Sequence, residues 1–194
     1  MASSALASSF PVFDFNAYLD YELHASSRNE YYYGHVYAMA GGTDIHSATI
    51  LAATLHFARL LASKPYFIRN SDMKITTPNF NAAFYPDLSI HCNQKPNRNA
   101  ITYDSPTLIL EVLSPSTRKY DLTTKRKEYF RIPSLRHYLL LDSEAISVML
   151  YTRDDNQTWP KDPLTLTDPK ANIPLTALKI SLKLKDLYRQ TDLL

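Results

Sequence analysis

Apolar residues recur along the chain at two spacings, and each spacing predicts a different kind of element. Short runs rich in aromatic and branched apolar residues are typical of strands, and a recurrence every three to four residues is typical of helices. These patterns predict strands at residues 30–33, 35–40, 66–68, 73–76, 85–90, 108–113, 137–141 and 147–151, and helices at residues 13–23, 44–61 (or 47–61) and 121–132, the last with Asp121 as its N-cap. The order of the elements indicates a mixed α/β (α+β) fold, with helices before, within and after a central sheet.

The segments between and after these elements are less regular. Residues 93–104 are too polar for a core and predict a loop, and four prolines make residues 160–174 irregular. Residues 178–188 alternate lysine with apolar residues and predict a final strand or edge segment. The length of 194 residues and the 45% hydrophobic content suit one domain over residues 1–194, with residues 1–12 as a flexible N-terminal segment.

Composition and charge narrow the class of protein. The formal net charge is only +2, so the overall field would not draw the chain onto an anionic polymer or a membrane. Cys92 is the single cysteine, which excludes an internal disulfide and a cysteine-rich zinc site and fits the reducing cytoplasm, where we expect the protein. The beginning of the chain lacks the pattern of a secretory signal, and no apolar run approaches the length of a membrane span.

Asp87 and Glu111 are acidic residues in segments that otherwise predict buried strands. Asp87 follows Pro86, and Glu111 has three apolar residues before it and two after it. A buried carboxylate without a partner is costly, so such an acid usually has a cation or strong donors beside it. If the two strands are neighbours, both acids can hold one Mg²⁺, which favours oxygen ligands and keeps several waters. This arrangement suggests phosphodiester hydrolysis, in which a metal activates water.

A basic segment follows the second acidic strand. Residues 118–136 contain seven basic residues and two acidic ones, which favours a polyanionic substrate at this place. If Leu122 and Tyr129 belong to the inward stripe of the helix, Lys125 lies at the edge of that stripe and can reach inward. A lysine ammonium there could orient the attacking water or stabilise developing charge. Arg126 lies about equally close to the stripe, so the spacing does not choose between Lys125 and Arg126.

Several stretches together make the chain similar to a known family. They are Asn29-Glu30-Tyr31, Tyr37-Ala38-Met39-Ala40-Gly41, Ser71-Asp72-Met73, Tyr85-Pro86-Asp87, Leu110-Glu111-Val112-Leu113-Ser114-Pro115-Ser116-Thr117, and Tyr120-Asp121 with Lys125 and Tyr129. With these residues the chain resembles the Uma-type family of restriction-endonuclease-like domains, a branch of the PD-(D/E)XK nuclease superfamily. The resemblance implies a restriction-endonuclease-like fold with a central mixed sheet flanked by helices, a divalent-metal site built from Asp87 and Glu111, DNA as the substrate, and a homodimer.

The chain departs from the superfamily pattern two residues after Glu111. The motif has its lysine at this position, and this chain has Leu113. In the Uma-type branch the following helix supplies the lysine, and Lys125 is in the matching position. The resemblance therefore assigns the catalytic amine to Lys125.

Other polar residues match recurrent positions of the family. Glu30 resembles the extra acid that an early segment lends to many superfamily sites, and His46 and Asp72 would support the site. The basic residues expected to bind nucleic acid are Arg118, Lys119 and Arg126.

These residues also have ordinary structural interpretations, as turn caps (Asp72, Asp87), a packed histidine (His46), a solvated helix lysine (Lys125) or a hydrogen-bonding partner within a hairpin (Glu30). Glu111 is harder to explain in this way, because a charged residue within an apolar run is rarely buried unless it is paired.

The leading hypothesis is a Mg²⁺-dependent endonuclease that hydrolyses phosphodiester bonds of DNA, with Mn²⁺ as a substitute ion. Asp87 and Glu111 would hold the metal, Lys125 would assist the water or the transition state, and Glu30 would orient or supplement them. The alternative is a catalytically inactive nuclease-fold protein that acts as a nucleic-acid-binding or scaffold module, because Leu113 could signal a decayed site. A hydrolase of small phosphorylated molecules is disfavoured, since the chain has only three glycines and no glycine-rich phosphate loop.

Overall fold

The computed structural model describes residues 12–39 and 41–194, so residues 1–11 of the predicted flexible segment lie outside the described residues. Its largest element is a six-stranded sheet with the strand order β11-β10-β9-β8-β6-β3. β8 and β9 pair in parallel, and the other neighbouring strands of this sheet pair antiparallel, so the sheet is mixed, as the family resemblance implies. Its strands are β3 (Tyr66–Asn70), β6 (Leu88–Cys92), β8 (Leu108–Leu113), β9 (His137–Asp142), β10 (Val148–Thr152) and β11 (Leu164–Leu166).

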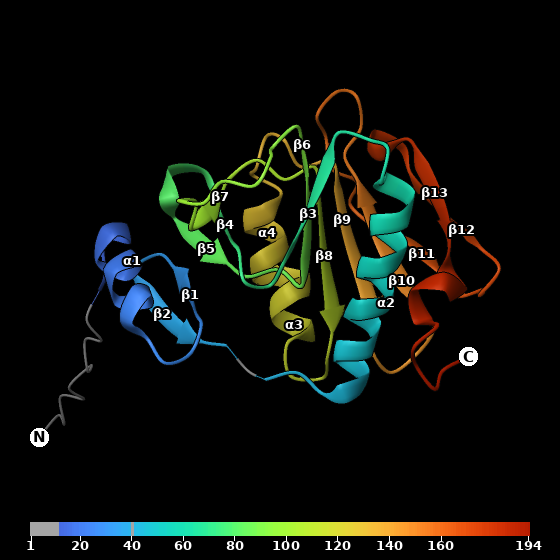
Figure 1. Cartoon of the computed structure of the whole chain (residues 1–194), viewed down its shortest axis with the longest axis horizontal. Helices are drawn as coiled ribbons and strands as arrows, with labels where there is room; N and C mark the ends of the chain where they lie inside the picture. Colours follow the sequence, from blue (N-terminus) through green and yellow to red (C-terminus); the bar gives the residue numbers. More distant parts are fainter. Residues whose placement is uncertain (1–11, 40) are drawn as a thin grey trace, which may run out of the picture.

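A smaller sheet of five short strands has the order β2-β1-β5-β4-β7. Figure 1 shows it on the opposite side of the large sheet from the antiparallel ladder of β12 and β13. Only β4 and β7 pair in parallel in the smaller sheet. The strands of these two units are β1 (Asn29–Tyr32), β2 (His35–Ala38), β4 (Lys74–Thr76), β5 (Ala82–Phe84), β7 (Thr102–Tyr103), β12 (Asn172–Leu175) and β13 (Ile180–Lys183).

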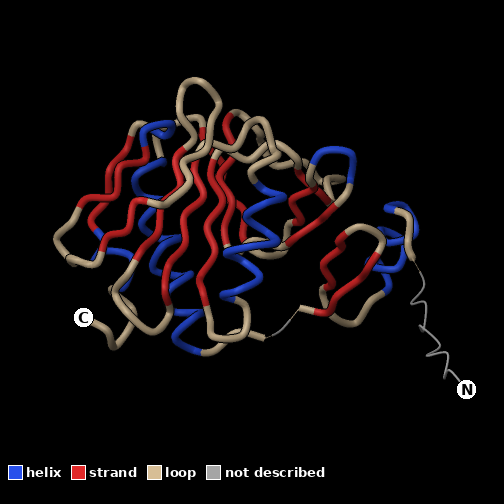
Figure 2. The backbone as a smooth tube through the Cα atoms, turned by 180° about the vertical axis from the view of Figure 1, so that it is seen from behind, coloured by secondary structure: helices blue, strands red, loops and turns tan. Residues whose placement is uncertain are grey.

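Helices lie on both faces of the large sheet (Figures 1 and 2). The longest helix starts where the Thr43 hydroxyl accepts a hydrogen bond from the amide of His46 at 3.3 Å. The helices are α1 (Phe15–His24), α2 (Asp44–Leu61), and a continuous helical run made of α3 (Arg118–Tyr120), a π-helical turn (Asp121–Lys125) and α4 (Arg126–Tyr129), with short 3₁₀ helices at Pro78–Phe80, Thr176–Leu178 and Leu184–Tyr188. Within the described residues, none of these helices has the length and apolar character needed to cross a bilayer.

The two faces of β8 belong to two separate apolar cores, because side chains alternate along a strand. Leu110 and Val112 pack with α2 and with the C-terminal segment in one core. Ile109 and Leu113 pack with the helical run in the other core. Glu111 lies between Ile109 and Leu113 in the strand and is also buried, so β8 presents an acid toward the helical run.

Two predicted boundaries near these elements are wrong. The helix predicted to start at Asp121 starts at Arg118, because the chain turns earlier and the amide of Arg118 donates to the carbonyl of Ser114 at 2.9 Å. Asp121 is therefore a buried residue inside the helical run and not its cap. The strand predicted from residue 85 starts at Leu88, and Pro86, which has no amide hydrogen to give to a ladder, lies before it.

The sequence pattern missed several short strands, namely β5, β7, β11 and β12. Each has two to four residues, and β7, β11 and most of β12 lie in stretches whose polar residues and prolines predict loop or irregular structure. Of residues 178–188, predicted as a final strand or edge segment, only Ile180–Lys183 form a strand, β13, and a 3₁₀ helix follows it.

His137 at the start of β9 joins the C-terminal segment to the large sheet. Its buried ring accepts a hydrogen bond at Nε2 from the amide of Ala177 at 3.1 Å, and its Nδ1 lies 3.1 Å from the hydroxyl of Thr152. Burial, with a smaller contribution from the Arg136 guanidinium, lowers the pKa of His137 to about 4. The folded protein therefore holds this histidine neutral.

We predict that His137 makes the protein less stable in acid. An unfolded chain protonates a histidine near pH 6.5, whereas the folded pKa is about 4, so stability is complete above pH 6.5 and falls as the pH drops toward 4. One histidine contributes at most about 1.4 kcal/mol per pH unit. Urea unfolding at several pH values gives the free energy of unfolding as a function of pH. Between pH 6.5 and 4 this free energy should fall less steeply for His137→Gln than for the wild type. Equal slopes would contradict the assignment.

Candidate metal and catalytic site

Glu111 is the centre of a buried polar cluster. Its side chain leaves β8 toward the helical run and the residue is 3% exposed. Oε1 accepts a hydrogen bond from the hydroxyl of Tyr129 at 3.0 Å and one from Nζ of Lys125 at 3.3 Å. Oε2 accepts a hydrogen bond from the backbone amide of Asp87 at 3.3 Å. Three donors thus hold the carboxylate, which is what burial of an acid requires.

Asp87 lies next to Glu111 because their strands are neighbours. Leu88 pairs with Leu110, which places the residue before Leu88 beside the residue after Leu110. Oδ2 of Asp87 accepts a hydrogen bond from the amide of Val112 at 2.7 Å. The two acids are therefore fixed relative to each other by hydrogen bonds in both directions between the two segments.

His46 approaches Asp87 from the first turn of α2. Its Nε2 lies 3.4 Å from Oδ2 of Asp87, and both side chains are largely buried. The hydrogen bond with Asp87 raises the pKa of His46 and outweighs burial, which lowers it. The imidazole consequently acts as a partial countercharge for this carboxylate.

Lys125 points inward and brings three acids together. It is 7% exposed, and its Nζ lies 3.1 Å from Oε1 of Glu30, 3.3 Å from Oε1 of Glu111 and 3.2 Å from Oδ1 of Asp121. Asp121 and Lys125 are four residues apart in the π-helical turn, a type of turn that is frequent at functional sites. Glu30 comes from β1 in the smaller sheet, where it also accepts a hydrogen bond from the amide of Tyr85 at 3.3 Å.

The cluster contains more acids than cations. Four carboxylates, those of Glu30, Asp87, Glu111 and Asp121, surround the ammonium of Lys125 and the imidazole of His46.

Burial and the neighbouring charges shift the pKa values of Glu111 and Lys125. Burial raises the pKa of Glu111 well above its usual range, and neighbouring carboxylates add to the rise against the effect of Lys125. Burial alone would lower the pKa of Lys125, but Glu111, Glu30 and Asp121 raise it well above its usual range, so the ammonium stays charged. A divalent cation beside the acids would balance the excess.

A cavity of about 550 Å³ opens onto this cluster. The four acids, Lys125 and His46 all line it. Its rim includes exposed residues from two loops, Gly41 before α2 and Ser116 before the helical run. A substrate can therefore reach the buried acids from solvent between these loops.

The donor set fits a hard divalent ion. Within residues 12–39 and 41–194, no three His, Cys, Asp or Glu side chains form a complete ligand group by themselves. Mg²⁺ does not need such a group, because it keeps several waters and is commonly held by one or two carboxylates. Asp87 and Glu111 offer carboxylate oxygens of this kind at a place with excess negative charge.

The structure places the other predicted residues away from the cavity. Asp72 is exposed and contacts Arg28 at 3.1 Å. Arg118 forms an ion pair with Asp142 at 2.6 Å, and Lys119 is exposed at the start of the helical run.

Arg126 points toward β10 and not toward the acids. Its guanidinium donates a hydrogen bond to the hydroxyl of Tyr151 at 2.7 Å and lies 5.2 Å from the centre of that ring. Lys125 therefore faces the acids and Arg126 does not, a difference that the spacing in the sequence does not reveal.

Asp121 and Tyr129 contact the central pair, a role that the sequence analysis does not assign to them. Both belong to the stretches that resemble the family, but the residue pattern places Tyr129 in the apolar stripe and Asp121 at a helix cap. The four-residue spacing from Asp121 to Lys125 was a usable signal, since side chains four apart meet on a helix. Nothing local indicates that the Tyr129 hydroxyl would reach Glu111.

The chain is similar to two uncharacterised proteins of the cyanobacterium Synechocystis. One is 33% identical over 159 residues, which cover 82% of this chain and 84% of the relative. The other is 29% identical over 148 residues, which cover 73% of this chain and 81% of the relative.

The fold is also similar to a solved structure, described as "a putative nuclease belonging to DUF820" from Anabaena variabilis, with a TM-score of 0.76 and 16% sequence identity. The match covers 92% of this chain and 98% of that chain, so the nuclease-like fold extends over nearly all of both. The sequence profile of the Uma2 family, described as "Putative restriction endonuclease", matches residues 15–185. Because this match covers most of the chain, including β1, β8 and the helical run that supply Glu30, Glu111 and Lys125, the chain belongs to the Uma2 family.

Proposed function

We propose that this protein is a divalent-metal-dependent endonuclease that hydrolyses phosphodiester bonds of DNA, with Mg²⁺ as its ion. The observation that carries the proposal is the contact of Lys125 with Glu111, beside Asp87, in a cavity that substrate can enter. The family description and the nuclease fold of the solved structure support a hydrolase acting on nucleic acid. The choice of DNA follows the family description, which names a restriction endonuclease.

Asp87 and Glu111 are the residues that would hold the ion. Bound there, a divalent ion would supply Lewis acidity toward the phosphate and toward the attacking water. Glu30 adds a further carboxylate to the same cavity and would supplement these two acids. Hydrogen bonds from Val112 and Tyr129 keep the two acids in fixed orientations, so little reorganisation accompanies binding.

Lys125 supplies the positive charge next to the reacting phosphate. Its ammonium is held in place by acids from three elements, so its orientation is set before substrate arrives. A preorganised donor of this kind stabilises charge that develops on phosphate oxygens in the transition state. Tyr129 and His46 are positioning residues, because they contact Glu111 and Asp87 and act through them.

The DNA on either side of the cleaved phosphodiester bond would need contacts with the protein outside the cavity. Lys119, exposed at the start of the helical run, and Arg118 beside it are the basic residues nearest in sequence to the loop at the rim. We propose that they bind backbone phosphates, and that the protein acts as a homodimer, as the family resemblance implies.

A second candidate is a nuclease-fold protein that binds nucleic acid without cutting it. The surroundings of Lys125 favour this candidate, because carboxylate oxygens of three different residues lie within 3.3 Å of its ammonium. An ammonium engaged in this way has few donors to offer to a substrate. Metal binding without cleavage would favour this second candidate.

Glu111→Gln tests the metal site directly. Glutamine keeps the size of the side chain and can accept the Tyr129 hydrogen bond, but it removes the negative charge that would hold the ion. We predict that cleavage of supercoiled plasmid in Mg²⁺ falls on the order of 100-fold or more. The matched control is Glu144→Gln, an exposed glutamate, which should cut as the wild type does. If both variants keep wild-type rates, Glu111 is not part of the site.

Lys125→Met tests whether the ammonium supports both folding and cleavage. The variant leaves three buried acids without their shared cation, so we predict a loss of roughly 3–5 kcal/mol in the free energy of unfolding, together with loss of plasmid cleavage. Lys127→Met is the control, because Lys127 is exposed on the same helix and its loss should cost no more than about 0.5 kcal/mol. Lys125→Arg, which keeps the charge, should recover most of the stability. Equal stability of Lys125→Met and Lys127→Met would contradict the account.

A further inference from the structure

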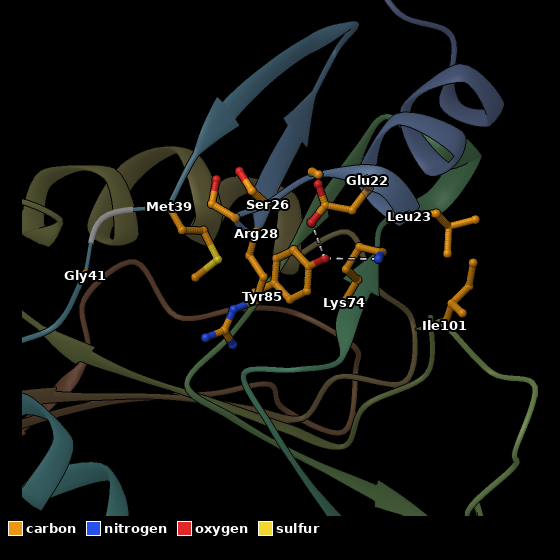
Figure 3. A pocket seen from close by; sticks show the side chains of 11 residues that line it. Glu22, Leu23, Ser26, Arg28, Met39, Gly41, Lys74, Tyr85 and Ile101 are labelled. Carbon is orange, nitrogen blue, oxygen red and sulfur yellow. Dashed lines mark hydrogen bonds between the residues drawn. The ribbon is translucent and has the colours of Figure 1, made fainter.

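A second cavity adjoins the cavity of the carboxylates. It has a volume of about 520 Å³ and shares Met39, Gly41 and Tyr85 with the first, so the two form one continuous groove. Figure 3 shows it extending from Gly41 at one end to Leu23 and Ile101 at the other. A linear molecule seated over the acids would therefore continue into this second cavity.

Lys74 is a buried cation on the wall of this second cavity. It lies on β4 and is 8% exposed. Within the described chain, its ammonium donates one hydrogen bond, to the hydroxyl of Tyr85 at 3.0 Å. A lysine ammonium has three donors, so two remain for a ligand. Burial lowers the pKa of Lys74 against the opposing effect of Glu22, and an anion in the cavity would offset that cost.

Glu22, the acid that lines this cavity with Lys74, does not form a direct ion pair with it. Figure 3 shows the Tyr85 hydroxyl between the Glu22 carboxylate and the Lys74 ammonium. That hydroxyl donates to Oε1 of Glu22 at 2.6 Å, and the backbone amide and side-chain amide of Asn29 donate to Oε1 and Oε2 at 2.9 and 3.0 Å. Glu22 thus has three donors of its own, and its charge stands one phenol away from Lys74.

Arg28 is the other cation that lines this cavity, but its charge is already offset. It forms an ion pair with Asp72 at 3.1 Å and also donates to the carbonyl and hydroxyl of Ser71. Its side chain is 46% exposed, so it belongs to the rim. Lys74 is therefore the cation of this cavity that is positioned to bind a ligand.

We propose that Lys74 binds a backbone phosphate of a nucleic acid strand, adjacent to the phosphate that occupies the carboxylate cavity. Tyr85 connects the two places, since its amide holds Glu30 and its hydroxyl holds Lys74. Tyr85 and Asp87 are two residues apart, so their Cα atoms are separated by at most about 7 Å. The groove thus has a cluster of acids for the ion and, at Lys74, one ammonium for the flanking phosphate. This inference rests on the proposed function for the identity of the strand.

The test measures binding without cleavage. The affinity for a fluorescently labelled single-stranded oligonucleotide is determined by anisotropy in EDTA over a series of salt concentrations. Loss of one phosphate contact should reduce the slope of log K against log salt by about 0.7. We expect Lys74→Met to show this reduction and an affinity roughly tenfold lower at low salt. The control is Lys161→Met, an exposed lysine whose loss changes the net charge equally and should leave the slope unchanged.

A measurement on the wild type removes the dependence on a foldable variant. Acetylation of lysines, followed by mass spectrometry, should show protection of Lys74 by the oligonucleotide while Lys161 still reacts. Equal slopes for the two variants, or no protection of Lys74, would overturn the subsite. Cleavage of plasmid by the wild type in Mg²⁺ is scored separately. If the wild type cleaves plasmid but Lys74→Met binds the oligonucleotide as the wild type does, the proposed function stands and the subsite is rejected. If Lys74 contributes to binding but the wild type does not cleave, the subsite stands and the nuclease function is rejected.

Discussion

The buried ammonium of Lys125 is the interaction on which the site depends. Its acidic partners come from a hairpin strand, a central strand and its own helical run, at Glu30, Glu111 and Asp121. Taking such charges out of water costs several kcal/mol per ion and is offset only when the partners meet in good geometry. The smaller sheet, the large sheet and the helical run must therefore all be docked before the site exists, which couples the chemistry to the integrity of the fold.

The sequence pointed to the residues of this site that are charged but lie within or beside an apolar pattern. Glu111 interrupts an apolar run whose bounds, residues 108–113, match β8, and Lys125 lies at the edge of an apolar stripe that does face the sheet. The four-residue spacing from Asp121 to Lys125 is a local signal for their contact, whereas the π-helical turn that contains both residues has no signature in the sequence. The contact with Glu30 depends on how the hairpin docks, a long-range arrangement that spacing cannot supply.

Leu113 is explained by the same geometry. It is buried at the position where a superfamily lysine would otherwise stand, and it packs in the core that contains Tyr129 of the helical run. The Lys125 ammonium reaches Glu111 from the helical run, and Leu113 completes the apolar core on the same face of the strand. Tyr85 joins the two cavities of the groove, because its amide donates to Glu30 and its hydroxyl accepts from the Lys74 ammonium. One residue between two strands thus contacts an acid of one cavity and the lysine of the other.

The most direct measurement of the central claim is the anomalous density of Mn²⁺ in crystals of the wild-type protein. The account predicts one strong peak in the carboxylate cavity, bonded to an oxygen of Asp87 and an oxygen of Glu111, with the Lys125 ammonium beside it. Peaks found only elsewhere on the protein, with the two acids still held by their hydrogen bonds and no ion between them, would contradict it.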